Sequence, residues 1–171
     1  RTRIGKVRKN LFWGPVPIIS NKYWAKALRG AGYLSKTFVQ EYYESINQKH
    51  DFDQYLADCM PTKFRSRLWV RGFGYYFAFI QSIHGFGVFH IPFSGGFLGA
   101  TAIWFVEPYL IRLAGRKTIV IPYGSDFYAY SRVLDTSLRH ALLLSYPEAS
   151  KKERRLKAQV ESWTKMADIV V

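Results

Sequence analysis

Four consecutive residues, Tyr123-Gly124-Ser125-Asp126, place a phenol, a hydroxyl and a carboxylate directly after the β-branched run 118–121. A carboxylate accepts hydrogen bonds from sugar hydroxyls or backbone N–H groups, and a phenol can donate as well as accept. We therefore take Tyr123 and Asp126 as candidate catalytic residues, and Gly124 and Ser125 as candidate ligand-binding residues. The same composition is also typical of a turn that only caps the following segment.

A second candidate is the loop 14–21, where a glycine and two prolines precede a helix that we predict from Asn21. The N–H groups and the positive dipole at a helix N-terminus bind phosphates and sugar hydroxyls, which makes Gly14 and Asn21 candidate binding residues. The loop matches neither the dinucleotide-binding glycine pattern nor a phosphate-binding Walker sequence, and its prolines have no N–H donor. A rigid turn without a ligand is the alternative.

The loop Ser94-Gly95-Gly96 precedes a helix predicted from residue 98, so we expect it to offer N–H groups to a ligand in the same way. A plain capping turn is the alternative. His90 lies within a predicted strand just before this loop. It either binds a ligand at the end of the strand or is a core histidine with an internal partner.

Composition limits the classes of function. The 171 residues are 49% hydrophobic, which predicts one folded domain, and the net charge of +13 favours anionic partners. We find no nucleic-acid-binding signature and expect no nucleic-acid partner, although a basic nucleic-acid-binding protein remains an alternative. The histidines and the single cysteine have no metal-ligand spacing, so we expect no metal. Roughly 35 residues from Gly72 carry no charge, but glycines and Pro92 divide them into pieces too short for a membrane span.

Elements that position these residues follow from hydrophobic periodicity and turn signals. We predict strands at 10–13, 34–39, 88–91, 118–121 and 168–171, the last of them buried. We predict helices at 21–29 with a cap at Ser20 or Asn21, 51–58, 63–83, 98–113 with a kink at Pro108, 136–144 capped by Thr136, and from Pro147 onward. Alternating strands and helices predict an α/β fold: a Rossmann-like, mostly parallel sheet with helices on both faces. Loops 14–21, 92–97 and 123–126 then share the carboxyl edge, where such sheets bind ligands.

The order of these segments resembles the N-terminal domain of GT-B glycosyltransferases of the family-4-like group. The resemblance covers residues 10–171 and is carried by the segments "NKYWAKALRGAGY", "SKTFV", "GVFHIPFSGG", "RKTIVIPYGSDFY" and "WTKMADIVV". Gly14 matches the glycine of the first loop, His90 the first histidine of an "HxH" strand, and Gly124-Ser125-Asp126 a "GSD" turn. Tyr123 stands where the family often has a histidine near the reacting sugar, and Pro92 replaces the second histidine of "HxH".

The resemblance implies the acceptor-binding half of a hexosyltransferase-type enzyme, without its donor-binding C-terminal domain. Such an enzyme transfers a sugar from a nucleotide-sugar to an acceptor hydroxyl, typically with retention and without a bound metal. The nucleotide-sugar is a co-substrate held by the other domain, and no tightly bound cofactor is expected. We divide the chain into a basic segment, 1–9, and the domain, 10–171. A non-catalytic Rossmann-type binding module is the alternative.

The resemblance also implies a cytoplasmic enzyme of polysaccharide biosynthesis that acts on a sugar or glycolipid acceptor at the inner face of the membrane. The basic and aromatic residues that would suit docking on an anionic membrane are Lys63, Arg65, Arg67, Trp69 and Arg71. A solvated basic helix face is the alternative.

Overall fold

The computed structural model describes residues 10–124 and 126–171, without the side chains of Arg67, Leu68 and Ala149. Within this part of the chain, six parallel strands form one sheet in the order β3-β2-β1-β4-β5-β6. The strands are β1 (Asn10–Trp13), β2 (Leu34–Val39), β3 (Gln54–Tyr55), β4 (Val88–Ile91), β5 (Lys117–Val120) and β6 (Ile169–Val170). The helices are α1 (Ile19–Gly30), α2 (Arg67–Gly85), α3 (Glu107–Leu113), α4 (Thr136–Ser145), α5 (Pro147–Lys151) and α6 (Glu153–Met166). The predicted basic segment 1–9 lies outside the described residues.

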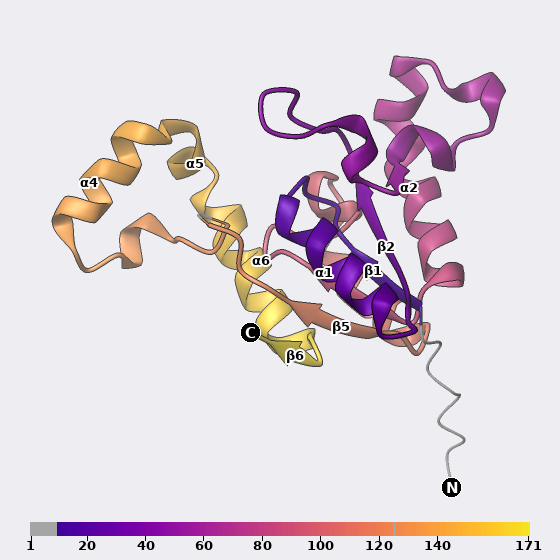
Figure 1. Ribbon diagram of the computed structural model, residues 1–171. Coiled ribbons are helices and arrows are strands. Elements are labelled where there is room, and N and C mark those ends of the chain that lie inside the picture. Colours follow the sequence, from indigo (N-terminus) through magenta and orange to yellow (C-terminus); the bar gives the residue numbers. More distant parts are fainter. Residues whose placement is uncertain (1–9, 125) are drawn as a thin grey trace, which may run out of the picture.

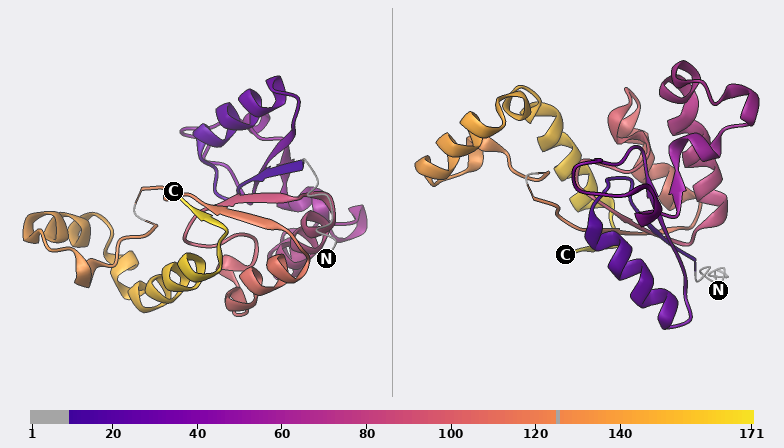
Figure 2. Two further views of the ribbon diagram at one scale, coloured as in Figure 1. Left: turned by 90° about the horizontal axis from the view of Figure 1, so that it is seen from below. Right: turned by 45° about the horizontal axis from the view of Figure 1, so that its top comes forward.

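Helices cover both faces of the sheet, which confirms the predicted Rossmann-like α/β class. α1 lies on one face, and α2, α3 and α6 lie on the other (Figure 2). This division follows from the strand order: the chain moves one way from β1 to β2 and the opposite way from β1 to β4, and right-handed crossovers then place the helices on opposite faces. α4 and α5 extend away from the sheet (Figure 1).

Phenylalanines of neighbouring strands form the centre of the core. Phe12 of β1, Phe38 of β2 and Phe89 of β4 are all buried, as expected for strands covered on both faces. Phe97, from the loop after β4, joins them with its ring centroid 4.9 Å from that of Phe12 and 4.7 Å from that of Phe38. This buried ring fixes the glycine-containing loop against the sheet.

The helix predicted over 98–113 is wrong in its first half. Residues Leu98–Ala100 and Trp104–Val106 form separate 3₁₀ turns, and the α-helix begins only at Glu107. A side chain from a distant segment holds the backbone here, because the Arg155 guanidinium donates hydrogen bonds to the carbonyl groups of Gly99 and Thr101. Pro108 does not kink a helix; it occupies the first turn of α3, where its missing N–H has no cost.

Three further predictions about local structure are wrong. In place of a helix over 51–58, Gln54–Tyr55 forms a strand paired with β2. α1 begins at Ile19 without a side-chain cap, so Asn21 lies inside the helix and is 1% exposed. α4 is capped by Asp135, whose carboxylate accepts the N–H of Leu138 at 2.9 Å, and not by Thr136.

Two other segments differ from their predicted form. β6 is an edge strand whose side chains are exposed, not a buried strand. The long helix predicted from Pro147 is divided at Lys152 into α5 and α6.

Candidate functional site

The loops after β1, β4 and β5 meet at the carboxyl edge of the sheet, as the sequence predicts. Parallel pairing of β1 with β4 and of β4 with β5 places their ends side by side. The strand order changes direction between β1 and β4, and open α/β sheets bind their ligands outside the strand ends at such a point. Of the predicted site residues, Ser125 lies outside the described residues.

His90 belongs to a stack of rings below this edge. Its ring lies parallel to that of Trp13, with centroids 3.8 Å apart. Nδ1 of His90 is 3.1 Å from the carbonyl oxygen of Phe12, and since a carbonyl only accepts, Nδ1 carries the proton. Burial lowers the pKa of His90 to about 4, although the hydrogen bond to Phe12 acts in the opposite direction. His90 is therefore neutral near pH 7, with its basic lone pair on Nε2 alone.

Tyr123 connects the loop after β5 to the first turn of α1. Its hydroxyl donates to Oδ1 of Asn21 at 2.8 Å, and the Asn21 amide donates to the carbonyl of Val16 at 3.4 Å. The Tyr123 ring also stacks near Trp24, at 6.3 Å between centroids. Burial raises the pKa of Tyr123 well above its ordinary value, with the nearby Asp126 carboxylate adding to the effect. The phenol thus keeps its proton and positions a loop; a catalytic role for it stays a prediction.

Asp126 joins the loops after β4 and β5. Its carboxylate accepts the N–H of Phe93 at 2.9 Å and the N–H of Tyr123 at 2.7 Å, one on each oxygen. Burial raises the pKa of Asp126, while these N–H groups act to lower it. Both oxygens are therefore occupied by the backbone, and Gly124, in the turn between them, has a positive φ of 65° that favours glycine.

Gly14 does not offer a free N–H to a ligand, contrary to expectation. Its N–H donates to the carbonyl of His90 at 3.2 Å. A Cβ at this position would lie 2.1 Å from the carbonyl oxygen of Phe38. The glycine is thus required because neighbouring strands approach its backbone closely.

The loop Ser94-Gly95-Gly96 also binds a group within the protein. Oε2 of the buried Glu107 accepts the N–H groups of Gly96 and Leu98, each at 3.2 Å, so these donors are not free for a ligand. A Cβ on Gly96 would lie 2.4 Å from the other oxygen, Oε1, which is buried without a hydrogen-bond partner. Burial raises the pKa of Glu107 to about 8, against the opposing effect of the backbone N–H groups. The sequence signal for Glu107 is its place as the first charge after the long uncharged stretch.

An open cleft of about 490 Å³ lies beside these loops. The residues that line it are Pro15, Val16, Gln40, Ser94, Gly95, Gly96, Gly99, Ala100, Asp126, Lys152, Arg155, Leu156 and Gln159. It therefore includes four of the predicted site residues, from the loops after β4 and β5. Gly14, Asn21, His90, Tyr123 and Gly124 are not among its lining residues.

The positive charge of the cleft comes from the start of α6, which sequence reasoning noted only as a basic cluster. The Arg155 guanidinium donates to the carbonyls of Gly99 and Thr101 at 2.6 and 2.7 Å. Gln159, 5% exposed, donates to the carbonyls of Ser94 and Gly99. Among the described residues, neither Arg155 nor Lys152 forms an ion pair with a carboxylate. The cleft is thus suited to an anionic ligand.

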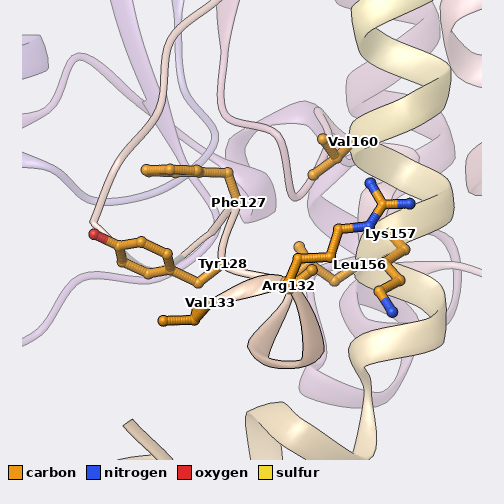
Figure 3. Close-up of a pocket in the computed structure, with 8 residues that line it drawn as sticks. Phe127, Tyr128, Arg132, Val133, Leu156, Lys157 and Val160 are labelled. Carbon is orange, nitrogen blue, oxygen red and sulfur yellow. The ribbon is translucent and has the colours of Figure 1, made fainter. Parts of the chain in front are cut away.

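In a neighbouring pocket, by contrast, the cations form ion pairs with carboxylates. It measures about 310 Å³ and lies between segment 127–133 and α6 (Figure 3). Its two cations, Lys157 and Arg132, pair with Glu153 at 2.8 Å and Glu161 at 3.4 Å. Leu156 lines both spaces and separates this neutralised pocket from the cationic cleft.

No protein-family model, curated protein or solved structure matches the chain. Across the described ranges, no helix has both the length and the hydropathy that crossing a bilayer requires. In the same ranges, no group of three or more His, Cys, Asp and Glu side chains is placed to hold a metal ion.

Proposed function

We propose that this Rossmann-like unit is the acceptor-binding half of a GT-B glycosyltransferase, of the family-4-like group, and that its acceptor binds in the cleft at the carboxyl edge. The observation that carries the proposal is the cleft itself: it lies at the point where the strand order changes direction, and its Lys152 and Arg155 pair with no carboxylate in the described part of the chain. The acceptor therefore carries an anionic group beside the hydroxyl that receives the sugar.

Polar groups of the cleft suit a sugar as well as an anion. The Gln40 amide and the Ser94 hydroxyl lie in its lining and can bond to sugar hydroxyls. In the transfer, the anomeric carbon exchanges its bond to a diphosphate oxygen for a bond to the acceptor oxygen, and the acceptor proton leaves with the nucleoside diphosphate. Nucleotide-sugar binding is then the task of a second domain, and retention without a metal is what the family resemblance implies.

The titratable residues at the carboxyl edge are better suited to positioning the loops and the ligand than to transferring a proton. Tyr123 keeps its proton at neutral pH, and His90 is held below the edge by Phe12 and Trp13. Asp126 is the one acid in the described cleft lining, and backbone N–H groups occupy both its oxygens. Because none of these three side chains is free to transfer a proton, they also favour the second candidate function, a non-catalytic Rossmann-type module that binds an anionic sugar.

Transfer assays separate the two candidates. We expect residues 1–171 alone to turn over no nucleotide-sugar, and turnover by this chain would contradict the half-enzyme proposal. When joined to a donor domain, the protein should transfer sugar to a phosphorylated acceptor, with the product identified by mass spectrometry. Lys152→Gln should then raise the KM for the acceptor and leave the KM for the nucleotide-sugar unchanged. Lys165→Gln, at an exposed lysine near the end of α6, is the matched control. Binding without transfer in the joined protein would favour the binding module.

A further inference from the structure

The outer face of α2 exposes large apolar side chains along most of the helix. These residues, which we call the α2 stripe, are Trp69, Phe73, Phe77 and Ile80, with 45%, 50%, 47% and 59% of their surface exposed. Their spacing of three or four residues places them on one side of the helix. The stripe extends about 17 Å at the rise of an α-helix.

The stripe is not the face by which α2 packs on the sheet. Ala78, Phe79 and Ser82 form that face and are all at most 5% exposed. α2 is therefore apolar on both sides, one against the core and one toward solvent. Edge-to-face contact of Phe64 with Trp69, at 5.4 Å between ring centroids, extends the apolar surface beyond the N-terminal end of the helix.

Cations border this surface, and one acid, Glu41, shares a pocket with the last of them, Arg71. Lys63 and Arg65 precede α2, and Arg71 lies within it; all three are exposed. The sequence contains no Asp or Glu between Asp58 and Glu107. The predicted basic surface also included Arg67, whose side chain lies outside the described residues.

We propose that the α2 stripe docks this protein on the surface of a bilayer that contains anionic lipids. Aromatic side chains are enriched at membrane interfaces, and a helix lying in the interface combines an apolar face with basic residues. A second copy of the chain would instead bring an equally cationic segment to the same surface. The stripe residues insert among the lipids, while Lys63, Arg65 and Arg71 meet the anionic headgroups.

Docking in this way places the cleft near the bilayer. A pocket of about 450 Å³ adjoins the cleft through their shared residues Pro15, Val16 and Gln40. Its far side is formed by Val70, Arg71 and Tyr75 of α2. A ligand with its anionic group in the cleft could thus extend along this pocket toward the membrane. The docking itself does not depend on the proposed transferase activity.

Vesicle co-sedimentation, with no nucleotide-sugar present, tests the proposal. The protein should bind vesicles of phosphatidylcholine and phosphatidylserine, and bind pure phosphatidylcholine vesicles much more weakly. The variant Phe73→Gln/Phe77→Gln should reduce partitioning about tenfold or more, because two half-exposed aromatic rings no longer insert. Leu143→Gln/Leu144→Gln is the matched control: both leucines are exposed on α4, away from α2 (Figure 1), and this variant should bind as the wild type does.

Charge and oligomeric state complete the test. Lys63→Gln should weaken binding to phosphatidylserine vesicles, whereas Lys26→Gln on α1 should not. Equal binding by the α2 and α4 double variants would overturn the proposal, since it would show adsorption by net charge alone. A dimer in solution that dissociates on Phe73→Gln/Phe77→Gln would also overturn it, by assigning the stripe to a second copy. Circular dichroism confirms that each variant is folded.

Discussion

The two sides of the carboxyl edge use their polar groups differently. On one side, His90, Tyr123 and Asp126 bond to Phe12, Asn21 and the backbone, so that little of their hydrogen-bonding capacity is left for a ligand. On the other side, Lys152 and Arg155 form no ion pair with a described carboxylate, although Asp126 lines the same cleft. The residues with recognisable spacing therefore build the edge. Of the two cations, Arg155 also bonds to the backbone of Gly99 and Thr101, whereas Lys152 is exposed and available to bind.

This difference can be tested because the first side should respond to mutation with a loss of stability and the second with a loss of binding.

Gly14→Ala should be the most damaging change on the structural side. The new Cβ would lie 2.1 Å from the Phe38 carbonyl, at a φ of 153° that side chains rarely adopt. We expect a loss of about 3 kcal/mol or more in the free energy of unfolding, measured by urea denaturation. Gly30→Ala is the control: a Cβ added at Gly30 would meet no neighbouring atom within 4 Å, so this variant should be neutral or slightly stabilising. Similar stabilities for the two variants would contradict the assigned role of Gly14.

Glu107→Gln should change how stability depends on pH. The native pKa of Glu107, about 8, is above the ordinary 4.5, so the native state binds more protons; the stabilisation that Glu107 contributes is complete below pH 4.5 and is lost as pH rises to 8. Between pH 6.5 and 8 the wild type should lose about 2 kcal/mol that the variant keeps. His90 does not interfere in this window, because its lowered pKa costs stability only as pH falls from 6.5 toward 4. Parallel pH profiles of the two proteins would show that Glu107 is not the titrating group.

Tyr123→Phe should cost about 1 kcal/mol of stability, because it removes the hydrogen bond to Asn21. Affinity for an anionic sugar should stay unchanged. Tyr109→Phe, on an exposed tyrosine of α3, controls for loss of a hydroxyl and should alter neither property. If Tyr123→Phe kept full stability but lost sugar binding or transfer, Tyr123 would belong to the functional side of the comparison.

Lys152→Gln should have the smallest effect on stability, within about 0.5 kcal/mol, because the side chain is exposed and forms no ion pair with a described residue. Chemical denaturation measures this. A large loss of stability would place Lys152 among the residues that hold the edge together.

The strands and the shared edge were predictable because both depend on local patterns. The buried runs in β1, β2, β4 and β5, separated by helices, are sufficient to indicate a parallel sheet and to place the loops together. The segment 98–106 was not predictable, because its conformation depends on Glu107, Arg155 and Gln159, which reach it from other elements. The role of Lys152 and Arg155 in the cleft was missed for the same reason: a basic cluster at a helix start gives no indication of which of its members lack an acidic partner.

Whether the cleft binds an anionic acceptor is tested most directly by the equilibrium binding of a hexose phosphate to this chain, with the unphosphorylated hexose as reference. Calorimetry should detect the phosphate ester and not the neutral sugar, and Lys152→Gln should weaken the binding about tenfold, as expected for loss of a charge-assisted hydrogen bond. Lys165→Gln should bind as the wild type does. Equal affinity for the two sugars, or equal loss in the two variants, would contradict the account of the cleft as an anionic acceptor site.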